Sequence, residues 1–209
     1  TGYASHINPA HELAVKRIIE DATGVHVTCG HTLSDKANYR IRAETAALNA
    51  RIIPHLQGLL GDVATSLEQR GIDAAMMVVK SDGSLMNVTT AGLRPIETML
   101  SGPAASVAGA SFLADVPDAI VVDIGGTTTD TAVIRDEQVR TSAEGASVGR
   151  WRTHVNALDL RTLGLGGDSI IGWQRGVFTI GPRRVAPMAW LADRADVGPC
   201  LDWLAGFLD

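Results

Sequence analysis

The sequence predicts an α/β fold in which helices flank a mixed sheet, and three patterns indicate it. Apolar residues recur at helical spacing over residues 9–24 and 38–70. Two β-branched runs, at residues 119–124 and 129–134, surround the turn-forming letters GGTT. Short strand-like runs separate the helical stretches. This mixture favours layers of helices and strands with a hairpin, and it excludes a helix bundle.

The first part of the chain is expected to be mainly helical. Pro9 suits the first turn of a helix and Gly24 suits its end, so one helix is predicted between them, followed by a short strand at residues 25–29. Pro54 interrupts the apolar stripe of residues 38–70 and should break or kink it. Two consecutive helices are therefore predicted in that stretch.

The middle and the end of the chain carry further element signals. Residues 74–79 form a compact apolar run before an SDGS turn, which is typical of a buried strand. Pro103, near the start of SGPAASVAGASFL, predicts another helix with Ser101 or Gly102 as its cap. The remaining expected elements are strands near residues 138–141, 148–160 and after Val177, and a helix near Leu201.

Composition limits the classes of function. The 209 residues are 45% hydrophobic, so a substantial core can form in one domain, with possible subdomains at residues 1–100 and 101–209. A net charge of -5 without a run of Lys or Arg excludes nucleic-acid binding and a polybasic membrane patch. No apolar run reaches the roughly 18 residues that span a bilayer. Cys29 and Cys200 lie far apart without metal or disulfide-framework spacing, which argues against a zinc module and indicates a cytoplasmic protein.

The segment AIVVDIGGTTTDTAVI, residues 119–134, is predicted to bind phosphate. Its first run delivers Asp123 to the carboxyl end of a buried strand, where open α/β sheets place ligands. Gly125 and Gly126 lack a Cβ and accept positive φ, so a phosphate can approach successive backbone N–H groups. Three hydroxyl groups follow, those of Thr127, Thr128 and Thr129.

Facing aspartates are expected across this hairpin. A Walker loop or a dinucleotide fold would open onto a helix, whereas β-branched residues here predict a returning strand, and no Walker lysine is present. Simple pairing places Asp123 opposite Asp130, with Cβ atoms roughly 5 Å apart, where two carboxylates repel. Mg²⁺ held by one or both, directly or through water, would compensate, so both are candidate catalytic and metal-binding residues. The alternative is that one of them caps the turn.

Five segments resemble the hydantoinase A/oxoprolinase family, within the superfamily of sugar kinases, Hsp70 and actin. In chain order they are RAETAALNARIIP, KSDGSL, ETMLSGPAASVAGA, VVDIGGTTTDTAVI and TLGLGGDSI. The resemblance implies a ribonuclease-H-like, actin-like ATPase fold that uses ATP and Mg²⁺. It places Asp123 to Asp130 on the family's second phosphate motif. Its later, adenosine-side motif falls on Gly164, Gly166, Gly167 and Ser169.

The resemblance also implies further parts of the protein. Family members carry a first phosphate loop, DxGGT, near the start of an upstream domain, and this sequence has no such loop ahead of the one at residues 123–127. The chain is therefore expected to be a fragment that works with an upstream domain and a second subunit. The later motif often reads GxGGGS, whereas Asp168 adds a carboxylate here, which could cap a following helix.

The main functional hypothesis is a component of an ATP-dependent hydrolase that acts on a cyclic amide, such as a hydantoin or a 5-oxoproline-like lactam. Family relatives also drive the carboxylation of ketones, so a ketone carboxylase subunit is one alternative. A small-molecule kinase and a non-catalytic nucleotide-binding or assembly module are the others.

Other reactive residues have ordinary explanations. The six histidines are scattered without paired-ligand spacing, although a metal or substrate role stays open for His26 and His31 near a strand end. Cys29 is expected to be an inert packing residue. The adjacent Arg183 and Arg184 fit a phosphate contact and a solvated turn equally well.

Overall fold

The computed structural model describes residues 1–142, 145–187 and 198–205. The chain divides into two compact units. The first comprises Thr1–Ala119 with Val133–Leu160, and the second comprises Ile120–Ala132 with Arg161–Asp209. Among the described residues, none of the helices combines the length and the apolar character that crossing a membrane requires.

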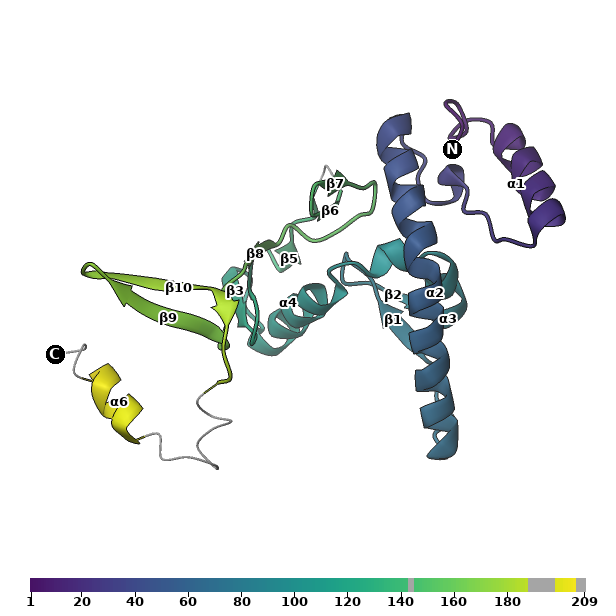
Figure 1. Cartoon of the computed structure of the whole chain (residues 1–209). Helices are drawn as coiled ribbons and strands as arrows, with labels where there is room; N and C mark the ends of the chain where they lie inside the picture. The colour runs from purple at the N-terminus through teal and green to yellow at the C-terminus, as the bar shows by residue number, and fades with distance from the viewer. Residues whose placement is uncertain (143–144, 188–197, 206–209) are drawn as a thin grey trace. The chain divides into compact units, whose positions relative to one another are not determined.

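Helices dominate the beginning of the first unit (Figure 1). The first helix ends at Gly24, which adopts the left-handed conformation with φ of 67° and donates its N–H to the carbonyl of Glu20, as its position predicted. The helical elements of this unit are α1 (Ala10–Thr23), η1 (Gly30–Thr32), α2 (Tyr39–Gln69), α3 (Val88–Leu93), η2 (Pro95–Thr98) and α4 (Ser101–Ala114).

Helix α2 is one continuous helix with Pro54 inside it, so the prediction of two helices is wrong. Side chains on both sides of the proline anchor it. Asn49 donates to the carbonyl of Leu93 at 2.9 Å and accepts from the N–H of Ile96 at 3.1 Å. Gln57 donates to the carbonyl of Gly92 at 3.1 Å. Because tertiary bonds hold both flanks, the loss of one backbone hydrogen bond at the proline does not end the helix.

Residues 25–29 form no strand, contrary to the prediction. The backbone of Val27 is satisfied by side chains of α1 instead of by a neighbouring strand. Its N–H donates to Glu20 at 2.9 Å and its carbonyl accepts from Lys16 at 3.1 Å. Satisfying the backbone in this way removes the need for a sheet partner.

Helix α4 begins without a side-chain cap, so the prediction that Ser101 or Gly102 caps it is wrong. Leu100 is the N-cap residue and lies in the left-handed region with φ of 63°. The helix therefore starts one residue earlier than the cap preference suggested, and Ser101 is already helical. Pro103 lies in the first turn, as predicted.

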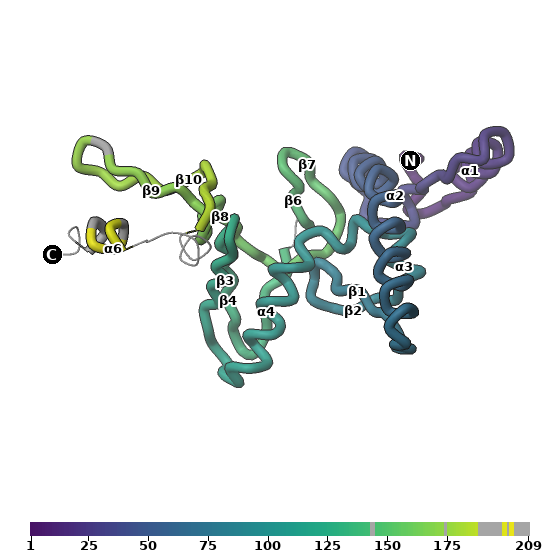
Figure 2. Tube along the Cα trace, turned by 60° about the horizontal axis from the view of Figure 1, so that its bottom comes forward, coloured from purple at the N-terminus to yellow at the C-terminus, as the bar shows by residue number. Residues whose placement is uncertain are grey.

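Every strand pair whose register is described is antiparallel. The run at residues 74–79 shortens to β1 (Met77–Val79), which pairs with β2 (Leu85–Asn87). Figure 2 shows β9 and β10 as a long hairpin. The other strands are β3 (Ala119–Ile124), β4 (Thr129–Arg135), β5 (Gln138–Val139), β6 (Ser147–Val148), β7 (Trp151–Arg152), β8 (Arg161–Leu163), β9 (Ser169–Gln174) and β10 (Val177–Arg184); the expected terminal helix is α6 (Gly198–Ala205).

Strand β4 is the centre of the main sheet. Its neighbours are β3, β5 and β8, and the sheet order runs β3, β4, β5 with β8 pairing the first part of β4. The apolar run in β3 is not buried on both faces as predicted, because its burial alternates. Ile120, Val122 and Ile124 are 74%, 53% and 69% exposed, and only the opposite face is covered.

The hydrophobic core of the first unit joins residues far apart in sequence. Its buried members come from α2, η2, the residue after η1 and the loops around β6 and β7, which explains how these segments are held together. They are Leu33, Ala46, Ile96, Ala146, Val155 and Ala157, with Leu48, Ile52 and Met99 packed against them.

Candidate functional site: a double glycine-rich cradle

The predicted phosphate hairpin is a tight turn between two strands. The N–H of Gly125, which follows β3, donates to the carbonyl of Thr128 at 2.9 Å and closes the turn. The chain then enters β4 at Thr129. The prediction that the glycines lead into a strand is confirmed, and this excludes the helix-opening geometry of Walker and dinucleotide loops.

A second glycine-rich segment, residues 164–169 between β8 and β9, packs against this turn. The N–H of Gly167 donates to the carbonyl of Gly125 at 2.9 Å, and the N–H of Asp168 donates to the carbonyl of Gly126 at 2.8 Å. The structure thus brings together the two motifs that the sequence placed about forty residues apart. We call the turn and this segment the cradle.

The close approach of two backbone segments explains why residue 166 of the cradle is a glycine. A Cβ built on Gly166 would lie 2.5 Å from the carbonyl oxygen of Gly125 and 2.6 Å from the carbonyl carbon of Gly126. The backbone would have to shift to relieve such a contact, so only glycine fits this position without distortion. Ser169 ties the segment further, because its hydroxyl accepts from the N–H of Gly166 at 2.9 Å.

Asp130 is buried in the cradle, only 6% exposed, and its carboxylate is held by hydroxyl groups. Thr162, opposite Asp130 in the β4–β8 pair, donates a short hydrogen bond to one carboxylate oxygen. Thr128 donates to the other at 3.4 Å. Sequence reasoning missed Thr162, because a three-residue strand carries no periodic signal and only the pairing register places it here.

The predicted threonines differ in their surroundings. Thr129 is buried and its hydroxyl donates to the carbonyl of Leu165 at 2.7 Å, which braces the cradle from inside. Thr127, at the tip of the turn, is exposed, and in the described part of the chain it makes no hydrogen bond. Asp123 is half-buried in β3, next to β4 in the sheet. Its position directly opposite Asp130 stays a prediction.

A charged pair lies beside the turn. Arg184 and Asp168 approach to 2.5 Å, and a Cβ on Gly126 would lie 3.1 Å from the Asp168 carboxylate. Asp168 precedes strand β9, so the idea that it caps a helix is wrong. Of the two adjacent arginines, Arg184 thus contacts an acid in its own unit.

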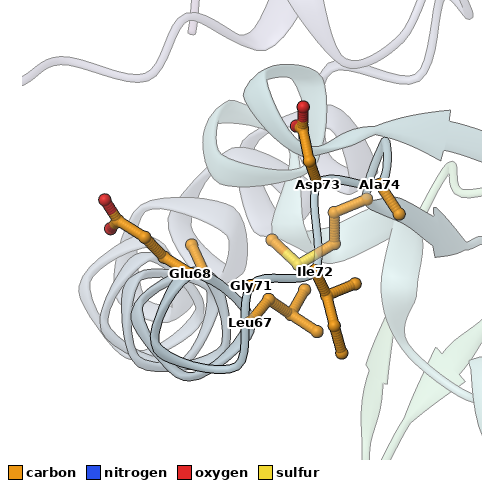
Figure 3. A pocket seen from close by; sticks show the side chains of 8 residues that line it. Leu67, Glu68, Gly71, Ile72, Asp73 and Ala74 are labelled. Atoms are coloured by element: carbon orange, nitrogen blue, oxygen red, sulfur yellow. The ribbon is translucent and has the colours of Figure 1, made fainter.

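The pockets described in this structure lie outside the cradle. Figure 3 shows one of about 460 Å³ at the end of α2, in the first unit. Leu67 and Ile72 meet there, while the carboxylates of Glu68 and Asp73 point apart. Polar groups do not converge in it, so it lacks the arrangement of a catalytic pocket. None of the predicted site residues lines it.

Comparison with known proteins identifies the family. The sequence profile of the hydantoinase/oxoprolinase family matches residues 42–191. The chain belongs to this family. 5-Oxoprolinase of Saccharomyces cerevisiae is 28% identical over 200 residues, covering 93% of this chain and 14% of that protein. The acetophenone carboxylase gamma subunit of Aromatoleum aromaticum is 26% identical over 196 residues, covering 88% of this chain and 26% of that subunit.

Solved structures of similar proteins share the fold. The ATP-dependent caprolactamase from Pseudomonas jessenii matches with a TM-score of 0.69 and 26% identity, over 87% of this chain and 27% of that one. Nucleotide-free acetone carboxylase matches with a TM-score of 0.71 and 22% identity, over 86% of this chain and 26% of that one. The predicted α/β fold of actin-like ATPase type is confirmed. The chain thus spans about a seventh to a quarter of the lengths of these relatives.

Proposed function

We propose that this chain is the phosphate-binding component of an ATP-dependent enzyme that hydrolyses a cyclic amide, such as a hydantoin or a 5-oxoproline-like lactam. The observation that carries the proposal is the cradle itself, in which the 164–169 segment is hydrogen-bonded to the Gly125–Gly126 turn beside a buried, oriented Asp130. The names of two relatives, 5-oxoprolinase and ATP-dependent caprolactamase, fit this reaction.

The residues of the cradle suit a nucleotide phosphate and Mg²⁺. The carbonyl side of the turn is occupied by the N–H groups of Gly167 and Asp168, whereas Thr127 is exposed with its hydrogen-bonding groups unused among the described residues. Gly126 presents no side chain to an approaching anion. Oxygen ligands and water are what Mg²⁺ prefers, and Asp123 and Asp130 would supply the carboxylates.

The chain's own residues would bind the phosphate oxygens and orient the carboxylates beside them. Bound Mg-ATP supplies the phosphoryl group that turns the amide carbonyl oxygen of the substrate into a leaving group. Thr127 would donate to phosphate oxygens, and Thr162 fixes the Asp130 carboxylate so that no reorganisation is needed on binding. Arg184 neutralises Asp168, which keeps an unpaired negative charge away from the phosphates.

A second candidate function is a subunit of an ATP-dependent ketone carboxylase. The matches to the acetophenone carboxylase gamma subunit and to acetone carboxylase favour it. Both functions use the same phosphate cradle, and they differ in the acceptor of the phosphoryl group. We also propose a cytoplasmic protein that works with an upstream phosphate loop and a second subunit, since one of these relatives is itself a subunit of an enzyme.

Nucleotide binding and turnover test the proposal. Mg-ATP binding is measured by calorimetry on the chain, and ADP formation is measured on a longer protein that adds an upstream phosphate loop and the partner subunit. Asp123→Asn and Asp130→Asn should each lower turnover by at least about 100-fold. Asp115→Asn is the matched control, because Asp115 is an exposed C-cap residue at which asparagine tolerates the left-handed φ of 49°.

The product distinguishes the reactions. Ring-opened acid formed together with ADP from a lactam supports the proposed hydrolase, whereas bicarbonate-dependent carboxylation of a ketone supports the second candidate. A phosphorylated substrate that accumulates identifies a small-molecule kinase. Absence of nucleotide binding in both the chain and the longer protein would overturn the phosphate-binding role and leave an assembly module.

A further inference from the structure

Three side chains of different chemistry converge in the first unit, outside the cradle. Glu12 in the first turn of α1 and Cys29 before η1 are buried, and His31 within η1 is half-buried. One ligand atom from each, a carboxylate oxygen, the thiol sulfur and an imidazole nitrogen, lies within 4.8 Å of the other two. The proposed phosphate chemistry does not use them.

Hydrogen bonds fix the carboxylate of Glu12. It accepts from the N–H of Gly2 at 2.6 Å and from the N–H of His31 at 3.1 Å, and it faces Nδ1 of His31 at 2.7 Å. An oriented carboxylate that needs no reorganisation is a suitable metal ligand.

The donor set selects the metal. Thiolate and imidazole are ligands that Zn²⁺ prefers and Mg²⁺ and Ca²⁺ avoid, and carboxylate is a common third ligand of zinc. Zinc bonds of about 2.0–2.3 Å place tetrahedral ligand atoms roughly 3.3–3.8 Å apart. The ligand atoms of this cluster lie within 4.8 Å of one another, so binding requires them to move closer together by about 1 Å or more where they are farthest apart. We propose that Glu12, Cys29 and His31 form a Zn²⁺ site with three protein ligands.

Two of the three side chains, those of Glu12 and Cys29, border a pocket. A pocket of about 250 Å³ is lined by Glu12, Cys29 and Thr28, among others. The hydroxyl of Thr28 is buried and has no hydrogen-bond partner among the residues that the structure describes. A water molecule on the zinc ion would complete the tetrahedron and give this hydroxyl a partner. The site therefore has the composition of an open zinc centre rather than a closed four-residue structural one.

Binding has a defined proton balance and a defined structural effect. The Cys29 thiol loses its proton to water. Nδ1 of His31 gives up the proton that it shares with Glu12 as the ring changes to the tautomer protonated at Nε2, and it then coordinates with the freed lone pair. The thiolate and the Glu12 carboxylate balance the charge of the ion. The ion links the first turn of α1 to the residues before and within η1. These segments otherwise meet through the contacts of Glu12 with His31 and a weak 3.8 Å contact between the Cys29 thiol and the carbonyl of Glu12.

The test is metal binding by the full chain after treatment with a chelator. Zn²⁺ affinity is measured by competition with a chromophoric chelator, and Co²⁺ replaces zinc as a spectroscopic probe. Bound Co²⁺ should show a thiolate-to-metal charge-transfer band and the intense visible bands of tetrahedral coordination. Cys29→Ser and His31→Gln should each weaken Zn²⁺ binding by at least about 10- to 100-fold, and Cys29→Ser should abolish the charge-transfer band.

Matched variants test whether Zn²⁺ binds at this site or at another cysteine or histidine of the chain. Cys200→Ser removes the other cysteine of the sequence, and His26→Gln removes a histidine that pairs with Glu20; both should bind Zn²⁺ like the original chain. Far-ultraviolet circular dichroism checks that each variant is folded. Lack of stoichiometric Zn²⁺ binding, or equal affinity in the Cys29→Ser and His31→Gln variants, overturns the proposal. An unchanged Co²⁺ spectrum in Cys29→Ser overturns it as well.

Discussion

The backbone N–H of Gly167 donates a 2.9 Å hydrogen bond to the carbonyl of Gly125. Together with the bond from the N–H of Asp168 to the carbonyl of Gly126, it joins the 164–169 segment to the turn that follows β3. Because the carbonyl of Gly125 accepts this bond, the carbonyl side of the turn is occupied by the protein's own N–H groups. The predictions below follow from this contact and from the buried polar groups around it.

Gly166→Ala should destabilise the second unit. The added Cβ would lie 2.5 Å from the carbonyl oxygen of Gly125, and the backbone must shift to relieve it. Overpacking of this kind costs about 1–3 kcal/mol. Urea unfolding should show this loss, and Mg-ATP affinity should fall with it. Gly164→Ala is the control, because a Cβ there meets nothing within 4 Å; equal destabilisation by both variants would contradict the explanation.

Thr162→Val should weaken the second unit by leaving the buried Asp130 carboxylate without one donor. The expected loss is about 1–3 kcal/mol in the free energy of unfolding. Thr131→Val on the partner strand is the matched control, since its hydroxyl donates to Arg161 at 3.2 Å in an exposed position. Its cost should stay below about 1 kcal/mol. Two similar unfolding curves would show that Thr162 does not hold Asp130.

Arg184→Ala should affect ligand affinity more than stability. The side chain of Arg184 is 57% exposed, so its ion pair with Asp168 contributes less than about 1 kcal/mol to folding. The unpaired Asp168 carboxylate beside Gly126 should repel phosphate and weaken Mg-ATP binding by about 10-fold, because like charges at close range disfavour each other. Calorimetric titration measures the change. Arg183→Ala serves as the comparison, and an identical loss in both variants argues against the pairing.

Stability of the first unit should fall as the pH drops below about 6.5. Burial lowers the pKa of His154 first, and the charges of Lys36 and Arg42 lower it further, against a small opposing effect of Asp35. The unfolded chain therefore binds a proton at higher pH than the folded chain does, and acid favours unfolding. The contribution is fully present above pH 6.5 and is lost as the pH falls through the folded pKa.

Thermal unfolding between pH 8 and pH 5 measures this effect, and His154→Gln should flatten the profile. Glutamine has no titrating group, and its amide can still form a hydrogen bond with Ser34, whose hydroxyl lies 2.6 Å from Nδ1 of the ring. A variant whose profile keeps the original slope would assign the acid sensitivity to other groups.

Local sequence patterns predicted the elements whose backbone bonds are made locally. The hairpin at β3 and β4, the C-terminal glycine of α1 and the helix α4 appear where they were expected. The two wrong predictions at Pro54 and at residues 25–29 share one cause. Pro54 lies inside a helix because Asn49 and Gln57 anchor both of its flanks, and residues 25–29 stay out of a sheet because α1 side chains satisfy Val27. Partners distant in sequence decided both cases.

By itself the sequence determined the fold class, the family and the turn at Gly125 to Thr128, since these depend on residue types in short segments. Only the tertiary structure decided that Thr162 orients Asp130, that Arg184 neutralises Asp168, and that Glu12, Cys29 and His31 meet. The reason is physical. Strand register and helix packing bring side chains together across gaps that no short pattern records, while hydrophobicity and turn preference act within a few residues.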